Sequence, residues 1–477
     1  MRIMVHNHPQ LRSIQTVGVV GMGYVGIPSA VLFAHSDQFS RVIGFQRDSS
    51  SSGHKIELLN QGILPLQGEE PNLKEMLTEV VLSGKFSCTS DFSLISSCDA
   101  VTLAIQTPFA NPTDLIPDFS ALEEGIRFVG RNLRPGTLVV LESTVTPGTT
   151  IGFACQLLEE ESGLQAGKDF FLAHAPERVM VGRLIQNIQE HDRIIGGIDE
   201  SSTLRAVELY KPVLTKGRVI PMSATAAEVT KTAENTFRDL QIAAANQLAL
   251  YCEAMGINFY DVRAGIDSLK GEGITRSILW PGAGVGGHCL TKDTYHLERG
   301  VTIAGVESLD YPSGMESLYV LARHINDFMP CHMFTLVSRA LAHAGKDLKG
   351  AKIALLGWSF MANTDDARNT PSGTFRDLCL EAGAEVRVHD PWVREYPGVT
   401  ISSDLPETIS GVDAIVIFTS HQEYYSIDPV LVLSCVSPRP VVVDGRNVIY
   451  PDRFIKAGFI YKGIGRGDKN PFPHNTS

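Results

Sequence analysis

The feature that most constrains the fold of this chain is a glycine-rich turn between a short apolar run and a helical pattern. Residues 17–20 are mostly valine, and residues 30–34 carry apolar side chains at helical spacing. Between them lies the pattern GxGxxG, made of Gly21, Gly23, Tyr24, Val25 and Gly26 with Met22. In this context the missing side chains let backbone N–H groups at a helix N-terminus approach a pyrophosphate. The turn predicts a dinucleotide-binding unit, and the plainer alternative is a tight turn without a ligand.

The strand pattern of the chain occurs twice. Strand-like runs at 42–45, 100–105 and 138–141 alternate with segments long enough for crossover helices, which favours a doubly wound parallel sheet. After Lys346 similar runs return at 352–357, 384–390, 413–418 and 440–444. We therefore expect an α/β protein with two Rossmann-like doubly wound parallel-sheet domains, joined by a central helical domain.

A long helix is predicted in the middle of the chain. Residues 224–255 are rich in alanine, contain no proline or glycine, and end at Gly256, a residue suited to a helix C-terminus. About 32 residues at 1.5 Å each give roughly 48 Å, longer than one compact domain needs. We expect this helix to bridge two domains and to pack against a second subunit.

Composition excludes several classes of function. Forty-one Lys and Arg against 53 Asp and Glu leave a net charge of −12, which disfavours binding to nucleic acid or to an anionic membrane. No apolar run reaches the roughly 18 residues of a membrane helix, and the polar N-terminus does not fit a signal peptide. The eight cysteines form no CxxC pair, so neither disulfides nor a metal site are expected. The prediction is a soluble, cytoplasmic protein.

The position after the second strand bears on the cofactor. A dinucleotide site usually carries an acidic residue about 20 residues beyond the last glycine, where it binds the ribose hydroxyls. Here that position holds Gln46, which hydrogen-bonds without a negative charge, and Arg47 beside it can pair with a phosphate. NAD is the leading cofactor, and tolerance of NADP is a hypothesis that a preference for NAD above about a hundredfold would remove.

A second glycine-rich segment, at 282–287, leads directly to Cys289, with Lys292 and Asp293 close behind. Backbone N–H groups and a nearby cation stabilise a thiolate, lowering the thiol pKa from about 8.5 and making it a nucleophile near neutral pH. The plainer reading of any single cysteine is a buried, inert thiol, and we assign the other seven to it.

These features occur with further motifs in a fixed order, and the chain thereby resembles the UDP-glucose/GDP-mannose dehydrogenases. That family oxidises the C6 alcohol of a nucleotide sugar to a carboxylate with two NAD. The likeness runs from about Thr16 to about Tyr461. Its motifs are the turn at 21–26, Thr107 with Pro108, 142–149, 175–179, Lys231 with Asn235, the Cys289 loop, 365–368 and 444–447.

The resemblance implies a division into domains. It assigns residues 1–212 to an NAD-binding domain, 213–330 to a central helical and dimerisation domain, and 331–477 to a UDP-sugar-binding domain. It also implies a homodimer formed through the long helix and a role in polysaccharide biosynthesis.

The resemblance further implies roles for single residues. Cys289 would add to an aldehyde intermediate, and the resulting thiohemiacetal would be oxidised to a thioester. Lys231 and Asn235, four residues apart on a helix and so on one face, would stabilise the oxyanions. Glu177 would be the general base for the hydrolytic water, held by Thr144 and Asp293. The plainer readings are a solvated Lys231, a surface Glu177, a strand-end Thr144 and an Asp293 that only pairs with Lys292.

The sequence around Glu177 points to one branch of the family. Arg178 and Val179 follow it, and residue 181 is valine where the UDP-glucose branch usually has a second glutamate. Together with His288 before the nucleophile, this resembles the branch that acts on UDP-N-acetylhexosamines, with UDP-N-acetylmannosamine and its GlcNAc or GalNAc relatives left open. The implied contacts are, for the cofactor, Gly21, Gly23, Tyr24, Val25, Gly26, Gln46, Arg47, Thr107 and Thr144; and, for the substrate, Glu177, Arg178, Val179, Lys231, Asn235, Arg276, Gly286, Arg368 and Arg446.

The sequence leaves three other functions open. These alternatives are a UDP-glucose 6-dehydrogenase, a two-electron dehydrogenase in which Cys289 only packs, and a non-catalytic sensor that binds nucleotide sugars. A departure at Met361, where the family often has a lysine, bears on the uridine contacts. NADH formed per sugar consumed separates four-electron oxidation, two-electron oxidation and sensing as two, one and none.

Overall fold

The structure is a computed structural model that describes residues 13–50, 52–66, 70–109, 116–179, 182–269, 277–303 and 317–470. The chain divides into two compact units. The first unit contains Met1–Glu234 and Tyr295–Tyr311, and the second contains Asn235–Thr294 and Pro312–Ser477.

The first unit is built on an 8-stranded sheet with the order β3-β2-β1-β4-β5-β6-β7-β8. Neighbouring strands pair in parallel except for β6 and β7, which are antiparallel. The strands are β1 (Thr16–Val20), β2 (Arg41–Phe45), β3 (Phe86–Thr89), β4 (Ala100–Leu103), β5 (Leu138–Leu141), β6 (Phe171–His174), β7 (Arg193–Gly197) and β8 (Val219–Ser223). The helices are α1 (Gly26–His35), α2 (His54–Asn60), α3 (Leu73–Leu82), α4 (Ser120–Arg131), α5 (Cys155–Ser162), α6 (Leu184–Glu190) and α7 (Glu200–Tyr210).

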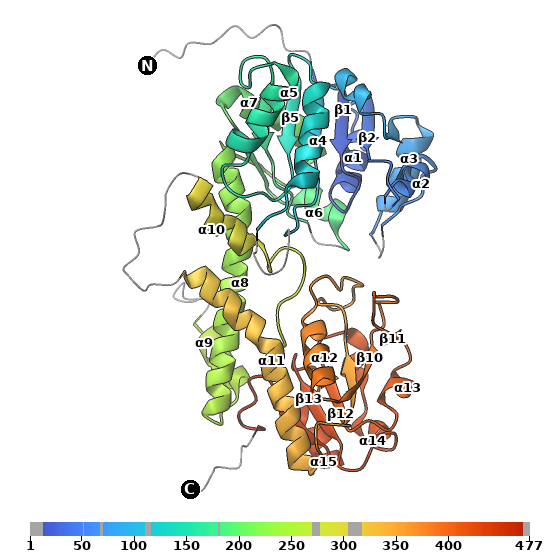
Figure 1. Cartoon of the computed structure of the whole chain (residues 1–477), viewed down its shortest axis with the longest axis vertical. Coiled ribbons are helices and arrows are strands. Elements are labelled where there is room, and N and C mark those ends of the chain that lie inside the picture. Colours follow the sequence, from blue (N-terminus) through green and yellow to red (C-terminus); the bar gives the residue numbers. More distant parts are fainter. Residues whose placement is uncertain are drawn as a thin grey trace. The chain divides into compact units, whose positions relative to one another are not determined.

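Helices cover both faces of this sheet (Figure 1). Apolar residues of α1, α3, α6 and α7 share one buried cluster with Val17, Val19 and alternate residues of the other strands. Residues of α4 and α5 share a second cluster with Val101, Leu103 and Val139 on the opposite face. Strands covered on both faces are almost wholly apolar, which is why β5 is an unbroken apolar run and β4 is apolar apart from Thr102.

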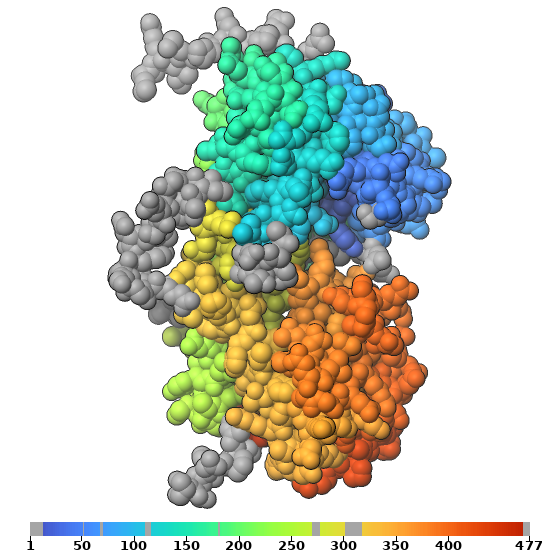
Figure 2. Space-filling view, viewed as in Figure 1, coloured from blue at the N-terminus to red at the C-terminus, as the bar shows by residue number. Residues whose placement is uncertain are grey.

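The second unit is built on a 6-stranded parallel sheet with the order β11-β10-β9-β12-β13-β14. Its strands are β9 (Lys352–Leu356), β10 (Glu385–His389), β11 (Ile401–Ser402), β12 (Ala414–Ile417), β13 (Val441–Asp444) and β14 (Ile460–Gly463). Helices α9, α11 and α12 pack with the C-terminal part of α8 on one face, and α13, α14 and α15 pack on the other. The bounds are α9 (Phe259–Asp267), α11 (Leu318–Ala344), α12 (Pro371–Glu381), α13 (Leu405–Ile409), α14 (Pro429–Leu433) and α15 (Pro451–Ala457). Figure 2 shows the outer surface of α11 and α12, in amber and orange, which pack against each other.

Two helices contribute residues to both units. Helix α8 (Ala224–Ala254) is a single helix of 31 residues, as its alanine-rich, glycine-free sequence predicts. It ends before Gly256, whose φ of +69° suits a helix terminus. Figure 1 shows α8, in light green, as one uninterrupted helix. Helix α10 (Asp293–Ile303) begins just after the Cys289 segment.

The predicted α/β architecture, with two sheets and a long central helix, is confirmed, and each predicted strand is present within one or two residues. The antiparallel pair β6–β7 was not predicted. Helix α6 is short and does not carry the chain back to the end of the sheet where β6 starts. Strand β7 therefore starts at the end where β6 stops and runs antiparallel to it. None of the helices in the described part of the chain combines the length and apolar character needed to cross a membrane.

Candidate active site

The glycine turn joins β1 to α1 and leaves an open cavity beside it in the first unit. Gly21 has a φ of +98°, and a Cβ there would lie 2.6 Å from the carbonyl oxygen of Ala104. A Cβ on Gly26 would lie 1.9 Å from the carbonyl oxygen of Gly21, so a side chain would push α1 away from the strand. A Cβ on Gly23 would meet nothing within 4 Å. Gly23 lines a cavity of about 380 Å³, as a pyrophosphate site at a helix N-terminus requires.

Tyr24 and Val25 complete the turn and are both half-buried. The first backbone bonds of α1 start here, with the N–H of Ile27 donating to the carbonyl of Gly23 (3.1 Å). The predicted residues of the turn are therefore together at the mouth of one helix.

Gln46 lies at the end of β2 and faces the glycine turn. Its Oε1 accepts a hydrogen bond from the N–H of Met22 (3.0 Å), and its Nε2 donates to Oγ of Ser52 (3.0 Å). All three residues line the cavity. The amide thus holds the turn and the segment after β2 together without adding a negative charge.

Two cations line the same cavity. Lys55 donates from Nζ to the carbonyl of Met22 (3.1 Å), and burial lowers the pKa of its ammonium. Within the described ranges Lys55 has no carboxylate partner. Arg47 also lines the cavity but is ion-paired with Glu124 of α4. The phosphate contact expected of Arg47 therefore competes with an existing ion pair.

The loops after β4 and β5 are joined to each other. The Thr107 hydroxyl is buried and donates to the carbonyl of Thr144 (2.7 Å). The N–H of Ile105 donates to Oγ of Ser143 (2.9 Å). Thr144 is half-buried, so its position is set by the neighbouring loop as well as by its own strand.

Glu177 lies in the loop after β6 and is 8% exposed. Its carboxylate is ion-paired with Arg193 at the start of β7, and Oε1 accepts a hydrogen bond from the N–H of Arg178 (2.8 Å). Because the side chain is buried and paired, the surface-charge reading of Glu177 does not hold. The next two residues are also anchored. The Arg178 guanidinium donates to the carbonyl of Asp192 and lies 3.5 Å from the Glu234 carboxylate, while Val179 packs against the apolar core.

Lys231 lies on α8 and is 8% exposed. Among the residues the structure describes, its ammonium has no hydrogen bond and no carboxylate partner, in contrast to Arg178, which is paired with Glu234. A buried cation without an anion is costly, and the solvated-helix reading does not fit this burial. The position suits a ligand or reaction intermediate that brings negative charge.

Cys289 lies in the second unit, half-buried, at the entrance of α10. Its carbonyl accepts the N–H groups of Lys292 (3.1 Å) and Asp293 (2.9 Å). The Asp293 carboxylate is fully buried and receives Nζ of Lys292 (3.1 Å) and Nδ2 of Asn235 (2.6 Å). The structure thus joins Asn235 of α8 to the Cys289 segment, and the pairing of Asp293 with Lys292 is also present.

His288 precedes Cys289 and has a lowered pKa. Burial, together with the nearby cations of Lys292 and Arg368, lowers the pKa of its imidazole to about 4, so the ring is neutral near pH 7. A neutral imidazole offers one donor and one acceptor nitrogen, which suits a neutral amide ligand.

The glycines of the Cys289 segment allow close packing against residues 360–369. A Cβ on Gly286 would lie 2.5 Å from Cβ of Phe360. The N–H of Gly287 donates to the carbonyl of Arg368 (2.8 Å), and Nδ2 of Asn369 donates to the carbonyl of Gly287 (3.1 Å). The Arg368 guanidinium pairs with Asp366 of its own loop. Gly286 and Arg368 are therefore neighbours of Cys289 in this unit.

Arg446 holds the same segment from β13. Its Nε donates to the carbonyl of Phe418 (2.9 Å) and its Nη2 to the carbonyl of Gly284 (3.1 Å). Burial lowers the pKa of its guanidinium. Arg446, predicted as a substrate ligand, fixes the Cys289 loop through Gly284.

A network of buried polar groups supports this loop from the helices. Arg323 of α11 donates to Asp239 (2.5 Å) and to the carbonyl of Leu290 (3.5 Å). The N–H of Gly282 donates to Oδ1 of Asn246 of α8 (2.9 Å). Sequence reasoning missed these residues, although a charged or amide side chain within an alanine-rich helix is a signal for such a network.

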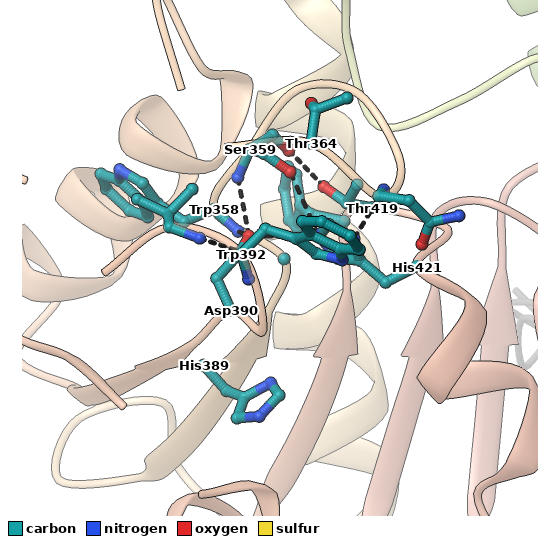
Figure 3. Close-up of polar contacts among 12 residues, drawn as sticks. Trp358, Ser359, Thr364, His389, Asp390, Trp392, Thr419 and His421 are labelled. Atoms are coloured by element: carbon teal, nitrogen blue, oxygen red, sulfur yellow. Dashed lines mark hydrogen bonds and ion pairs between the residues drawn. The ribbon is translucent and has the colours of Figure 1, made fainter. Parts of the chain in front are cut away.

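The second sheet also has a glycine turn, at Gly357 after β9, and the polar residues near it hydrogen-bond to one another (Figure 3). Asp390, which follows β10 as Gln46 follows β2, accepts the N–H groups of Trp358 (2.7 Å) and Ser359 (2.9 Å) on one oxygen. His421 donates from Nε2 to Asp390 (3.1 Å) and also lies 3.1 Å from Oγ of Ser359. All of these groups are buried. Ser, His and Asp here do not form a catalytic triad, because Ser359 and Asp390 share one nitrogen of His421, and the other accepts the N–H of Asn363.

The predicted residues are distributed over both units. The first contains Gly21, Gly23, Tyr24, Val25, Gly26, Gln46, Arg47, Thr107, Thr144, Glu177, Arg178, Val179 and Lys231; the second contains Asn235, Gly286, Cys289, Asp293, Arg368 and Arg446. Arg276 lies outside the described residues. The described part of the chain has no group of His, Cys, Asp and Glu suited to a metal ion.

The chain matches one family along most of its length. Residues 15–214 match the NAD binding domain of the UDP-glucose/GDP-mannose dehydrogenase family, residues 225–317 match its central domain, and residues 354–451 match its UDP binding domain. The chain is 37% identical over 452 residues to a UDP-N-acetyl-D-mannosamine dehydrogenase of Pyrococcus horikoshii, which covers 95% of this chain and 99% of that one.

Two solved structures are similar over nearly the whole chain. A crystal structure of an NDP-N-acetyl-D-galactosaminuronic acid dehydrogenase from Methanosarcina mazei Go1 has a TM-score of 0.89 and 68% identity, and covers 96% of this chain and 97% of that one. The structure of the UDP-D-ManNAc dehydrogenase from Pyrococcus horikoshii has a TM-score of 0.83 and 36% identity, over 95% of this chain and 100% of that one. The chain therefore belongs to the UDP-glucose/GDP-mannose dehydrogenase family and is an NAD-binding nucleotide-sugar dehydrogenase of that family.

Proposed function

We propose that the chain oxidises the C6 alcohol of a UDP-N-acetylhexosamine to a carboxylate, with two NAD consumed per sugar and Cys289 as the covalent nucleophile. The observation that supports this most is the environment of two side chains on α8, Lys231 and Asn235. Lys231 is buried without an anionic partner among the described residues, and Asn235, one turn further, hydrogen-bonds Asp293 in the Cys289 segment. A cation and an amide on one helix face suit the stabilisation of an oxyanion.

The cavity of the first unit fits a dinucleotide. It combines a helix N-terminus, the open space in front of Gly23 and polar side chains at the end of β2. When bound, the nicotinamide cofactor accepts a hydride in each of the two oxidations. Gly21, Gly23 and Gly26 would face the pyrophosphate, and Gln46 the ribose.

Cys289 supplies the covalent step. Its thiolate adds to the C6 aldehyde, forming a C–S bond and a thiohemiacetal; loss of a hydride from C6 gives a thioester, and water then breaks the C–S bond. One alcohol, one water and two NAD⁺ give one carboxylate, two NADH and three protons. The thiol returns unchanged, and the tether prevents loss of the aldehyde.

The neighbouring residues divide the remaining work. Lys231 and Asn235 stabilise the oxygen that becomes negative when the thiolate and later the water attack C6. Glu177 takes a proton from that water, while Thr144 and Asp293 hold it.

The sugar is assigned to the N-acetylhexosamine class. The Arg178–Val179 sequence after Glu177 and the neutral His288 favour an acetamido group, and the relatives compared above are named for N-acetyl-D-mannosamine and N-acetyl-D-galactosaminuronic acid. The 68% identical relative is a galactosaminuronic acid dehydrogenase and the 37% identical one a mannosamine dehydrogenase. We therefore place UDP-N-acetylgalactosamine and UDP-N-acetylmannosamine ahead of UDP-N-acetylglucosamine.

A substrate panel tests this proposal. UDP-ManNAc, UDP-GalNAc, UDP-GlcNAc and UDP-glucose are compared by kcat/KM, and NADH is counted per sugar consumed to completion. The expected result is two NADH per sugar, with a UDP-N-acetylhexosamine preferred over UDP-glucose by at least about tenfold, or 1.4 kcal/mol. One NADH per sugar indicates a two-electron dehydrogenase, none a sensor, and preference for UDP-glucose the other branch.

Tolerance of NADP is a finer part of the proposal. Gln46 brings no negative charge that would repel a 2′-phosphate, and Lys55 brings an ammonium without a carboxylate partner among the described residues. Calorimetric binding of 2′,5′-ADP and 5′-AMP measures the 2′-phosphate contribution directly. Affinities within tenfold of each other are expected, and 5′-AMP binding more than a hundredfold tighter contradicts tolerance.

We also propose a homodimer formed along α8. Phe237 and Tyr251 of α8, and Met255 directly after it, are 56%, 58% and 59% exposed, which is unusual for large apolar side chains so close along the chain. Sedimentation equilibrium of the wild type is expected to give twice the chain mass of 51.9 kDa. A monomer at all concentrations contradicts the dimer.

A further inference from the structure

Arg193 occupies an unusual position in the first unit. It begins β7, its side chain is 5% exposed, and its guanidinium lies between two carboxylates. Nη2 donates to Oε1 of Glu142 (2.9 Å) and to the carbonyl of Ala175 (3.0 Å), while Nη1 is ion-paired with Oε2 of Glu177. One side chain therefore connects the ends of β5, β6 and β7.

A second layer holds the guanidinium in this orientation. Tyr210 of α7 donates from its hydroxyl to the same Oε1 of Glu142 (2.7 Å), and its ring lies 4.2 Å below the Arg193 guanidinium carbon. The Tyr210 side chain is fully buried. A planar guanidinium stacked on a ring and bonded at its edge has one orientation available.

The arrangement fixes the Glu177 carboxylate on both oxygens. Oε1 accepts the N–H of Arg178, and Oε2 faces Arg193. The neighbouring His174 does not compete for these contacts as a cation, because burial and the positive charges of Arg193 and Lys231 lower the pKa of its imidazole to about 3. Arg193 is thus the cation that contacts both Glu142 and Glu177.

Stability alone does not explain this network. A buried ion pair contributes little net free energy of unfolding, because desolvation offsets the attraction, and apolar replacements are often neutral. A general base, in contrast, requires a fixed carboxylate within hydrogen-bond reach of its proton. The energetic cost of burying two carboxylates and one guanidinium is consistent with selection for the orientation of the Glu177 carboxylate.

We propose that Arg193 is a positioning residue that orients the Glu177 carboxylate for hydrolysis of the thioester, with Glu142 and Tyr210 holding Arg193. The inference rests on the proposed function, in which Glu177 is the base for water. It adds three residues to the hydrolytic step, none of which touches the substrate.

The test compares Arg193→Lys with Arg205→Lys. Lysine keeps the charge but reaches one carboxylate instead of bridging two. Arg205 is a matched control, because its side chain is also 5% exposed in the same unit and it bonds Glu208 rather than Glu177. Both variants are assayed with a UDP-N-acetylhexosamine for steady-state turnover, for the rapid burst of NADH, and for turnover in the presence of hydroxylamine.

The expected result is selective loss of hydrolysis. Steady-state turnover of Arg193→Lys falls at least tenfold, while a burst of two NADH per site remains, because both hydride transfers precede the step that needs the base. Hydroxylamine cleaves a thioester to a hydroxamate without a general base and restores turnover to within about threefold of wild type. Arg205→Lys retains wild-type turnover and gains nothing from hydroxylamine.

Two results would overturn the inference. One is wild-type turnover in folded Arg193→Lys; the other is equal loss of burst and turnover without rescue by hydroxylamine, which indicates a structural role. If Arg193→Lys does not fold, Tyr210→Phe is tested instead, because it removes only the hydroxyl that bonds Glu142. Its steady-state turnover is expected to fall by about threefold to tenfold and to be restored by hydroxylamine. Unchanged turnover of Tyr210→Phe overturns the inference. Glu177→Gln separates the two proposals: without thioester accumulation in that variant, the base assignment itself fails.

Discussion

Replacing Asp390 by asparagine tests how the second unit holds the loop that contacts the nucleophile segment. One carboxylate oxygen accepts the N–H groups of Trp358 and Ser359, and the other those of Trp392 and Val393. A carboxamide of the same shape keeps one acceptor oxygen and turns an NH2 group toward the other pair of donors. Hydrogen bonds to a charged group contribute about 1.5–3 kcal/mol each, so losing two costs roughly 3–6 kcal/mol. Removing a buried charge offsets part of this, and the expected net loss is about 3 kcal/mol.

The pH dependence of this loss has a definite sign. Burial by itself raises the pKa of Asp390, but hydrogen bonds from His421 and the backbone hold it below its ordinary value, which is about 3.9 in an unfolded chain. A carboxylate whose folded-state pKa is lowered stabilises the fold above the unfolded pKa, and this stabilisation is lost as the pH falls through the folded pKa. The difference between wild type and variant should therefore be constant from about pH 8 to pH 5 and shrink below about pH 4.

The assay is urea unfolding of the full chain followed by tryptophan fluorescence, since Trp358 and Trp392 both donate to Asp390. Asp413→Asn is the control. Its carboxylate bonds Lys346 and the N–H of Lys352 but is 21% exposed, so a loss of about 1 kcal/mol is expected. A loss below about 1 kcal/mol for Asp390→Asn, or a difference that grows on acidification, would refute the reasoning.

The other predictions concern the cofactor turn and the buried lysine. Gly21→Ala should lower the thermal midpoint by about 5–10 °C, because the φ of Gly21 is positive and the added Cβ would lie 2.6 Å from a carbonyl oxygen. Gly23→Ala should leave the midpoint unchanged, while calorimetry shows an affinity for NAD at least about tenfold weaker. Equal effects of the two substitutions would contradict this geometry. Lys231→Met should keep or raise the thermal midpoint, because it removes a buried cation that has no carboxylate partner in the described structure. The kcat of this variant should fall by about a hundredfold or more. A strong loss of stability with normal kcat would show that Lys231 is structural.

Much of the fold follows from local pattern. The predicted runs at 17–20, 100–105 and 138–141 became β1, β4 and β5 because strands buried on both faces are mostly apolar. Helix α8 followed from its composition and from the stop at Gly256. The strands β6 to β8 were not predicted, because β7 carries arginine and two glycines and β8 is exposed, so neither resembles a core strand.

The site was predictable where a motif carries its own chemistry and not where it depends on tertiary contacts. The glycine turn and the Cys289 segment could be recognised in the sequence, because the spacing of glycines indicates where the backbone comes close to a ligand or to another segment. Arg193 was missed because nothing in the sequence near it marks its contact with Glu177. The pairing of Arg47 with Glu124 and of Arg446 with two carbonyls was equally invisible, since each partner lies far away along the chain.

The measurement that tests the account most directly is the yield of uronate from Cys289→Ser with a UDP-N-acetylhexosamine and NAD, quantified by anion-exchange chromatography. A hydroxyl of high pKa replaces the thiolate, so the sugar carboxylate should form at less than about a thousandth of the wild-type rate. Uronate produced by this variant at the wild-type rate would contradict the thioester route.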